Sequence, residues 1–396
     1  MSAAVTEVVE VAIGKRVRIE SVDVLRGVVM ILMALDHVRD FFAPGLSPTN
    51  LTQTTTALFL TRWITHFCAP VFFLLTGTGA YLALRRKSNQ ELSRFLFTRG
   101  LWLIFVELVL LRCFGWQFNF DYRLTMLVVL WALGWAMIVL SAMVQLPVSA
   151  VTCFGAVMIA GHNLLDSVQS SNPVWRVLHS PGPVWSNPHH VIFVAYPLIP
   201  WIGVTVVGYG LGQVYRWDTN RRKSFLLRLG IGATAAFVIL RIINVYGDPS
   251  RWSAQKFPVF TVLSFLNTTK YPPSLLFLLM TLGPAMVLLW AIDTHTPRLL
   301  RPALVFGKVP FFYYVLHVIL IHLLALLVCY ARYGQVHWMF ESPTLAQYPV
   351  TPPPGWGNSL AATYLIWAVV VVSLYPPCRW FTGVKHRRTD AWLSYF

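Results

Sequence analysis

The chain has 396 residues, of which 56% are hydrophobic and only 12% are charged, and its formal net charge is +16. Soluble domains contain about a quarter charged residues, so this composition excludes a water-soluble enzyme and a disordered chain. The basic residues flank long apolar runs, which is the pattern of the positive-inside rule and not that of a nucleic-acid-binding surface. We therefore predict an integral membrane protein with no nucleic-acid partner.

Several apolar runs have roughly the 20 residues that a helix needs to cross a bilayer. They predict an all-α, polytopic membrane helix bundle of about ten transmembrane helices. With the N-terminus inside, most basic clusters lie in the cytoplasm, and an even number of crossings keeps the C-terminal cluster there as well. Both termini are therefore predicted to be cytoplasmic. The runs lie near residues 22–42, 57–84, 96–115, 123–146, 148–166, 191–215, 225–247, 273–293, 303–332 and 357–383.

The predicted organisation is a cytoplasmic segment over 1–20, one transmembrane domain over 21–384 and a cytoplasmic tail over 385–396. We expect a multi-pass protein of the plasma (inner) membrane, surrounded by membrane lipid; a homo-oligomer is compatible with the sequence. The stretch Asp36–Asp40 replaces the small-residue site of a signal peptide, so the first helix is expected to be retained. The five cysteines lack metal-ligand spacing, and no metal site is predicted.

Ionisable side chains inside apolar runs are costly and tend to face a cavity or a partner. Arg26 and His37 are eleven residues apart, which places them on one face of a helix at depths about 16 Å apart. Asp23 and Asp40 lie close to the same face. An arginine there can hold a phosphate, and an imidazole can act as a general base. The structural alternative is an Arg–Asp pair that tethers the helix and a histidine that packs in the core.

Other polar residues stand in later runs. His66 begins the outer part of the second run, and Thr76–Gly79 form a small-residue segment that favours close helix packing over a cofactor contact. Tyr314 lies one turn from His317, whereas His317 and His322 are about 140° apart on a helix and cannot both face one small site. The sequence contains no HExxH, Walker or GxSxG motif, so any chemistry must use His, Arg and Tyr side chains.

Three segments of the chain resemble a known family. The stretch from Arg18 through Gly27, continuing to His37, resembles the opening of the heparan-alpha-glucosaminide N-acetyltransferase catalytic family, and most closely its bacterial branch. Residues Lys270–Leu275 and Gly307–His317 are similar to later patterns of that family. The spacing of Arg26 and His37 also resembles the signature of integral-membrane acyltransferase family three, in the same transmembrane acyltransferase superfamily.

The resemblance implies transfer of an acetyl (acyl) group from cytoplasmic acetyl-CoA to an extracytoplasmic acceptor, a glycan or a lipid-linked sugar. It implies that Arg26, with Asp23 beside it, binds the acyl-CoA. The eukaryotic enzyme has its catalytic histidine between the first two helices, but residues 41–64 contain none here. His37 and His66 are therefore the alternatives for the base. The predicted roles around them are orientation by Asp36 or Asp40, and stabilisation of the oxyanion by Tyr314 or His317.

Two other functions remain open on the sequence. Buried His, Arg and Asp residues also mark the pathway of a proton-coupled transporter or exporter, although the two halves show no matching pair of interrupted helices. A non-catalytic membrane protein that keeps the fold is the third possibility. The outer loops near 167–190, 248–272 and 333–356 are rich in proline and aromatic residues, which favours anchoring at the membrane interface over a stacking surface for an acceptor.

Overall fold

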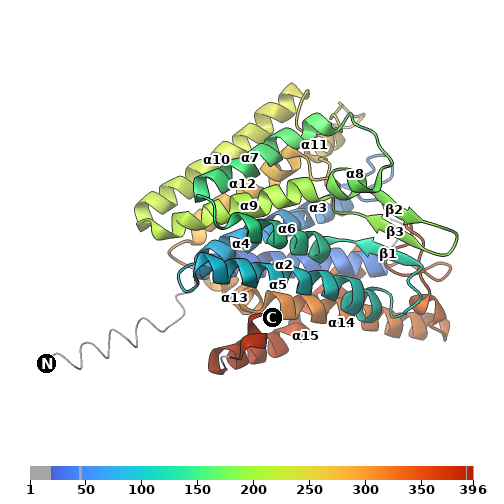
Figure 1. Ribbon diagram of the computed structural model, residues 1–396. Helices are drawn as coiled ribbons and strands as arrows, with labels where there is room; N and C mark the ends of the chain where they lie inside the picture. Colours follow the sequence, from blue (N-terminus) through green and yellow to red (C-terminus); the bar gives the residue numbers. More distant parts are fainter. Residues whose placement is uncertain (1–18, 44–46, 389, 396) are drawn as a thin grey trace.

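The structure is a computed structural model that describes residues 19–43, 47–388 and 390–395. The described chain is mostly helical, and its long helices run between two ends of one bundle (Figure 1). Most of the predicted cytoplasmic segment over 1–20, with Arg18 of the family-like stretch, lies outside the described residues. The predicted boundary at residue 384 falls inside the last long helix, which continues to Arg387.

The first half of the bundle runs from the first described helix to a short helix that precedes the second strand. Its elements are α2 (Glu20–Phe42), α3 (Thr56–Thr65), α4 (Cys68–Ala83), α5 (Asn89–Phe105), the π-helix η1 (Val106–Trp116), β1 (Leu124–Leu127), α6 (Val129–Met143), α7 (Val148–Gly161), the 3-10 helix η2 (His162–Leu165) and α8 (Pro173–Leu178).

The second half begins with the remaining two strands. Its elements are β2 (Gly182–Ser186), β3 (Val191–Val194), α9 (Leu198–Leu211), η3 (Gly212–Arg216), α10 (Thr219–Ile243), α11 (Pro258–Leu266), α12 (Leu275–Ile292), η4 (Arg298–Leu300), α13 (Arg301–Lys308), α14 (Pro310–Tyr333), η5 (His337–Phe340), α15 (Leu360–Arg387) and η6 (Ala391–Ser394).

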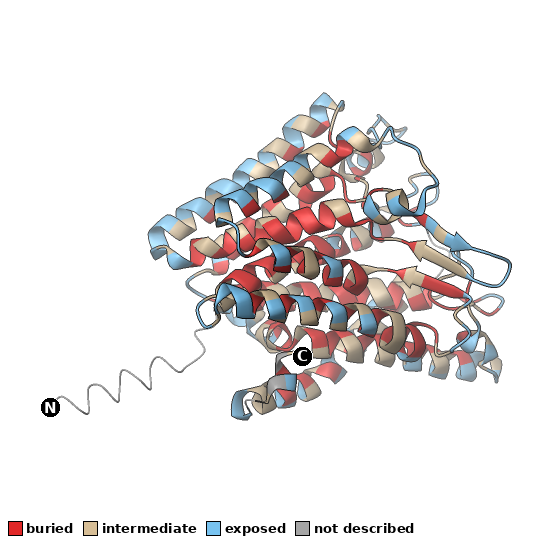
Figure 2. Cartoon of the chain, in the orientation of Figure 1, coloured by how far each residue is buried: buried red, intermediate tan, exposed pale blue. Residues whose placement is uncertain are grey.

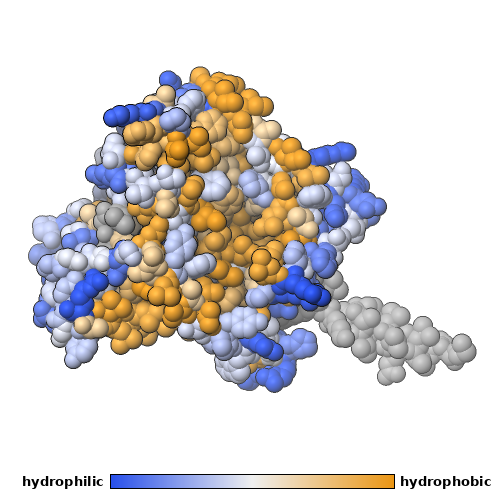
Figure 3. Space-filling view, turned by 180° about the vertical axis from the view of Figure 1, so that it is seen from behind, coloured by the Kyte–Doolittle hydropathy of each residue, from blue (hydrophilic) through white to orange (hydrophobic). Residues whose placement is uncertain are grey.

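Within the described residues, seven helices are long and apolar enough to cross a membrane, and α6 is a shorter apolar helix. The space-filling view in Figure 3 shows an apolar surface across the middle of the molecule, with hydrophilic residues towards both ends. This is the surface of a multi-pass membrane protein, because lipid tails accept apolar side chains and the headgroup regions accept charged ones. The predicted number of ten transmembrane helices and the cytoplasmic termini remain predictions.

A small sheet departs from the all-α prediction. Strands β1, β3 and β2 lie side by side in that order, with β1 parallel and β2 antiparallel to β3. The sheet stands at the end of the bundle away from the first described residues (Figure 1). Its strands have four or five residues each, so β1 and β3 were absorbed into the apolar runs predicted over 123–146 and 191–215.

Helix α2 lies inside the bundle, and most of its residues are buried (Figure 2). It contacts α13, α14 and α15 on one side and α3, α4 and α12 on others. A lipid-facing helix cannot carry the six charged residues of α2 at low cost, whereas a central one can turn them towards cavities and partners. The fold therefore places the charged residues of α2 where they can form sites.

Candidate functional site

We call the end of the bundle where α2 begins the inner end and the end where α2 finishes, at Phe42, the outer end. The inner end of the site is built where α2 crosses α13. Gly27 and Gly307 face each other so closely that a Cβ atom on Gly27 would lie 1.8 Å from the carbonyl oxygen of Ala303. This contact brings the backbones together and lets Arg26 Nη1 approach the carbonyl oxygen of Gly307, at 3.4 Å, and Asp23 Oδ1, at 2.9 Å. The family-like stretches around Arg26 and Gly307 are therefore two halves of one helix contact.

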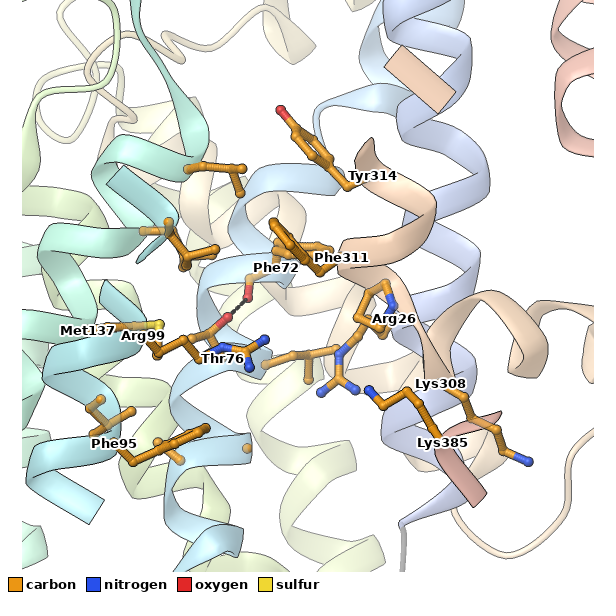
Figure 4. A pocket seen from close by; sticks show the side chains of 18 residues that line it. Arg26, Phe72, Thr76, Phe95, Arg99, Met137, Lys308, Phe311, Tyr314 and Lys385 are labelled. Atoms are coloured by element: carbon orange, nitrogen blue, oxygen red, sulfur yellow. Dashed lines mark hydrogen bonds between the residues drawn. The ribbon is translucent and has the colours of Figure 1, made fainter. Parts of the chain in front are cut away.

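Arg26 lines a cavity of about 240 Å³ in the inner half of the bundle, which we call the basic cavity. Arg99 of α5, Lys308 of α13 and Lys385 of α15 line it too. Figure 4 shows Arg26, Arg99 and Lys385 reaching towards one another, while Lys308 points away from them. Arg26, Arg99 and Lys385 come from helices that are far apart in sequence, so they come together only in the folded chain. Such a group of positive charges can bind several phosphate oxygens.

The residues of the segment Thr76–Gly79 lie on two faces of α4, one packed against a helix and one lining the basic cavity. Gly77 packs against the backbone of α9, where its Cβ would lie 1.9 Å from the carbonyl oxygen of Thr205, as the small-residue pattern predicts. Gly79 and Thr76 line the basic cavity, and Arg26 Nη2 is 4.0 Å from the Cβ position of Gly79. A side chain at Gly79 would therefore enter the space beside Arg26.

The outer half of α2 carries the second part of the site. His37 Nδ1 lies 2.7 Å from His317 Nε2, and the two rings are nearly parallel. His317 is fully buried, and its Nδ1 lies 3.0 Å from the carbonyl oxygen of Tyr313. A carbonyl can only accept, so the neutral pair has one consistent arrangement: His317 Nδ1–H donates to Tyr313, and His37 Nδ1–H donates to His317 Nε2.

This arrangement leaves Nε2 of His37 without its proton and able to accept one. His37 also lines a second cavity of about 470 Å³, which we call the outer cavity. An imidazole whose other nitrogen is fixed by a second residue is the arrangement that a general base requires. The predicted base therefore has an orienting partner, and that partner is His317 rather than Asp36 or Asp40.

The aspartates beside His37 are held in an ion-pair network. Asp36 accepts hydrogen bonds from Arg39, Arg62 and Thr65, and Arg39 also pairs with Asp40. Both aspartates line the outer cavity together with Lys270, so the cavity wall carries charges of both signs. Such a wall can hydrogen-bond the hydroxyl and amino groups of a polar acceptor.

Aromatic rings cover much of the remaining wall of the outer cavity. They are contributed by Trp116, Phe193, Tyr196, Tyr271, Tyr314 and Tyr348. Trp116 lies edge-on to His37, with ring centroids 4.9 Å apart. Aromatic faces next to charged and polar groups are suited to sugar rings, which present C–H faces and hydroxyl edges.

Two tyrosines of the loops at this cavity have shifted pKa values. Partial desolvation opposes ionisation of Tyr271, but the positive charges of Lys270 and Arg62 outweigh it and bring the pKa of the phenol below its ordinary value. Burial raises the pKa of Tyr348 well above its ordinary value, so this phenol stays protonated and can donate a hydrogen bond. The wall of the outer cavity therefore holds two phenols in different electrostatic surroundings.

Tyr314 joins the two cavities. Its side chain lines both of them, and it is 2% exposed in the molecule. Its hydroxyl has no hydrogen-bond partner among the described residues, although it is buried. A buried hydroxyl without a partner is costly, and a bound molecule that supplied an acceptor atom would remove that cost. Figure 4 shows Tyr314 at the end of the basic cavity opposite the Arg26 and Lys385 side chains.

The other predicted histidines lie elsewhere. His66 is buried at the end of α3, where its ring packs edge-on against Phe277, and it borders a neighbouring cavity rather than the one that contains His37. His322 is bound between the carbonyl oxygens of Gly115 and Met339. The prediction that His317 and His322 face different surroundings is therefore confirmed.

The tryptophans of the outer loops do not form the wall of the outer cavity. Trp356 packs against Phe42 and donates to the carbonyl oxygen of Phe41, which fixes the loop to the end of α2. Trp175 stacks on His179, and Trp185 is exposed on β2. The sequence does not predict the aromatic wall itself, because its residues come from η1, β3, α14 and three loops and share no local pattern.

Comparison with known proteins identifies the family of the chain. A search of curated proteins finds no match for the chain. A family model described as heparan-alpha-glucosaminide N-acetyltransferase, catalytic, matches residues 18–245. The match covers more than half of the chain and includes Arg26, His37 and Arg99, while Tyr314 and His317 lie beyond it. The chain belongs to the heparan-alpha-glucosaminide N-acetyltransferase catalytic family, a family of membrane acetyltransferases.

Proposed function

We propose that this protein is a membrane acetyltransferase that takes an acetyl group from acetyl-CoA in the basic cavity and transfers it to an acceptor in the outer cavity. The observation that carries the proposal is the position of Tyr314, which lines both cavities within reach of the His37–His317 pair. Two substrates that enter from opposite ends of the bundle can meet only at such a junction.

Acetyl-CoA fits the residues of the basic cavity. The phosphates of CoA are matched by Arg26, Arg99 and Lys385, and the extended pantetheine arm of CoA can lead from them towards Tyr314. Arg26 and His37 are separated by about 16 Å along α2, as eleven residues of helix require. The buried hydroxyl of Tyr314 supplies a hydrogen-bond donor for the oxygen of the thioester.

The chain's residues divide the transfer step between them. Nε2 of His37 takes the proton from the acceptor hydroxyl or amine as the acceptor atom bonds to the acetyl carbon. His317 accepts from Nδ1–H of His37 and so stabilises the imidazolium that forms. Tyr314 donates to the oxygen that gains negative charge. The carbon–sulfur bond then breaks, and the thiolate of CoA receives the proton from His37.

The acceptor is proposed to be a glycan or a lipid-linked sugar on the extracytoplasmic side of the plasma membrane. The mixed charges of Asp40 and Lys270 and the aromatic wall around them support this class, because sugars combine hydroxyl groups with apolar faces. The direction of transfer is supported by the basic clusters, which lie beside the Arg26 end in the topology that the positive-inside rule favours.

A reconstituted system tests the proposal. Sealed liposomes that contain the purified protein enclose a mixture of amino sugars and neutral sugars, and radiolabelled acetyl-CoA is added outside. We expect labelled acetylated sugar inside the vesicles, at a rate that His37→Ala lowers by about 100-fold or more, the usual contribution of a general base. His337→Ala, which removes a histidine that is half exposed, is the matched control.

Two results would contradict the proposal. One is the absence of acetylated product and of released CoA with every sugar in the mixture. The other is loss of enclosed sugar, or movement of protons, without acetyl-CoA, which is the behaviour of the transporter alternative. Full activity of His37→Ala would remove that histidine from the mechanism.

A further inference from the structure

A cluster of three metal-ligating side chains lies outside the acetyl-transfer site. His162 begins η2 at the end of α7, Asp166 follows η2, and His179 follows α8. The ligand atoms of these three residues lie within 4.8 Å of one another. The cluster shares no residue with the basic or the outer cavity, and the acetyl-transfer mechanism does not use it.

His162 is buried, but its ring lacks the hydrogen bonds that a buried imidazole normally makes. It is 2% exposed, and neither of its ring nitrogens has a hydrogen-bond partner among the described residues. The carbonyl oxygen of Pro273 lies near the ring but outside hydrogen-bond geometry. A buried imidazole gives up its hydrogen bonds to water on folding, so a ring with both nitrogens unpaired is costly unless a ligand binds it.

The other two ligands are oriented towards the same point. Asn163 Nδ2 donates to Asp166 Oδ2 at 2.8 Å, which leaves Oδ1 to face His179 Nε2 at 3.6 Å. The Asn163 side chain is itself fixed, because its Oδ1 accepts from the backbone N–H of Leu275 at 2.8 Å. A second residue that orients a ligating carboxylate is a regular feature of metal sites.

We propose that His162, Asp166 and His179 bind a divalent metal ion of the zinc class. Two imidazoles and one carboxylate match the preferences of Zn²⁺, and they leave one coordination position for water. Ligand atoms about 2.1 Å from a tetrahedral zinc lie about 3.4 Å apart, so the cluster contracts when it binds the ion. Nε2 of His179 donates its proton to the carbonyl oxygen of His162, at 2.9 Å; when zinc binds Nε2, that proton moves through water to Nδ1, so the ligand is a neutral imidazole and no net proton is lost.

The position of the ion gives it a structural consequence. His179 stands two residues before Pro181, which lines the outer cavity, and Asn163 is bonded to the first residue of α12. The ion joins the end of α7 to the segment between α8 and β2. The ion therefore fixes one part of the rim of the outer cavity. The side chain of Asp166 is 20% exposed, so the ion can enter the site past this residue.

The experiment measures metal directly and needs no acetyl-CoA, so its failure is separate from a failure of the proposed acetyltransferase function. The full chain is purified without a polyhistidine tag, dialysed against Zn²⁺ or Co²⁺, and analysed by mass spectrometry for metal per chain. We expect one ion per chain, and for Co²⁺ a visible absorption band of a four-coordinate site. His162→Ala, Asp166→Asn and His179→Ala should each lose most of the bound metal.

The matched control is His189→Ala, which removes an exposed histidine from the following outer loop and should keep the full metal content. If His162→Ala fails to fold, Asp166→Asn provides the test, because it keeps the shape of a partly exposed side chain. A rise of the wild-type melting temperature with increasing Zn²⁺, absent in Asp166→Asn, would support the site. Metal content at the background level in the wild type, or the same content in wild type and Asp166→Asn, would overturn it.

Discussion

At the scale of single residues, the central feature is a histidine pair drawn from distant parts of the chain. Helical spacing predicts that His37 shares a face with Arg26, and the structure places both on cavities. The sequence could not predict that His317 is the partner of His37, because the two are 280 residues apart and no local pattern links them. Asp36 and Asp40 were the neighbours in sequence, but arginines hold their carboxylates.

His317 acts through His37, so it is a positioning residue whose role can be separated from packing. In His317→Phe the ring volume remains, but the acceptor for His37 Nδ1–H is lost, and we expect kcat to fall about 10- to 100-fold with KM for acetyl-CoA unchanged. His317→Gln keeps an acceptor and should recover part of kcat. Steady-state kinetics on folded protein decides the matter: equal kcat values for the two variants would show that the hydrogen bond has no catalytic role.

Tyr314→Phe removes only the hydroxyl group from the junction of the two cavities. This hydroxyl has no partner among the described residues, so Tyr314→Phe should leave the melting temperature unchanged or raise it slightly. If the hydroxyl stabilises the oxyanion, the same variant should lose about 100-fold in kcat. Tyr364→Phe, a partly exposed tyrosine of α15, is the control. Normal turnover of Tyr314→Phe would exclude the oxyanion role.

At the scale of elements, the contact between α2 and α13 determines the geometry of the site. A Cβ on Gly27 would lie 1.8 Å from a backbone oxygen that cannot move independently of its helix. Gly27→Ala should therefore force the two helices apart and destabilise the protein by about 1–3 kcal/mol. The melting temperature in detergent measures this loss, and weaker binding of acetyl-CoA should accompany it because Arg26 is the next residue.

Gly232→Ala is the matched control for this prediction. Gly232 lies within α10, and nothing lies within 4 Å of its Cβ position. Alanine is a better helix former than glycine there, so the control should keep or raise the melting temperature. If Gly27→Ala were as stable as Gly232→Ala, the close contact of α2 and α13 would be contradicted.

The elements also show how far the sequence could predict the fold. Hydropathy and length locate the helices well, because a bilayer requires long apolar runs with intact backbone hydrogen bonding. They cannot show that the run over 57–84 contains a break between α3 and α4, or that α14 begins at Pro310 after a separate α13. They also miss the short strands and η1, which together supply Trp116, Phe193 and part of the outer cavity.

The metal cluster was equally hidden in the sequence. The cluster matches neither a cysteine spacing nor the HExxH motif, because His162 and Asp166 are four residues apart and His179 follows after α8. Histidine and aspartate at that spacing occur often without a metal. Only the fold shows that both nitrogens of His162 are buried without a partner.

At the scale of the whole molecule, the bundle contains two cavities of different character. One is lined by positive charges, and the other is lined by aromatic rings and by charges of both signs. Arg26, Arg99 and Lys385 converge in the first, and the His37–His317 pair stands beside the second, with Tyr314 between them. In the proposed reaction, this arrangement keeps a phosphate-bearing donor and a polar acceptor in separate cavities that meet at one hydroxyl. Under that proposal, the net charge of +16 serves substrate binding as well as topology.

Binding of acetyl-CoA in the basic cavity can be tested by a thermal shift without knowledge of the acceptor. A ligand that binds only the folded protein raises its stability in proportion to the logarithm of its concentration above Kd. Wild type, Arg26→Ala and the control Arg228→Ala, an exposed arginine of α10, are heated in detergent with increasing acetyl-CoA. We predict a rise of the melting temperature with the logarithm of acetyl-CoA concentration for the wild type and Arg228→Ala, and little or none for Arg26→Ala. No rise with any acyl-CoA, or an equal rise in Arg26→Ala, would contradict the account.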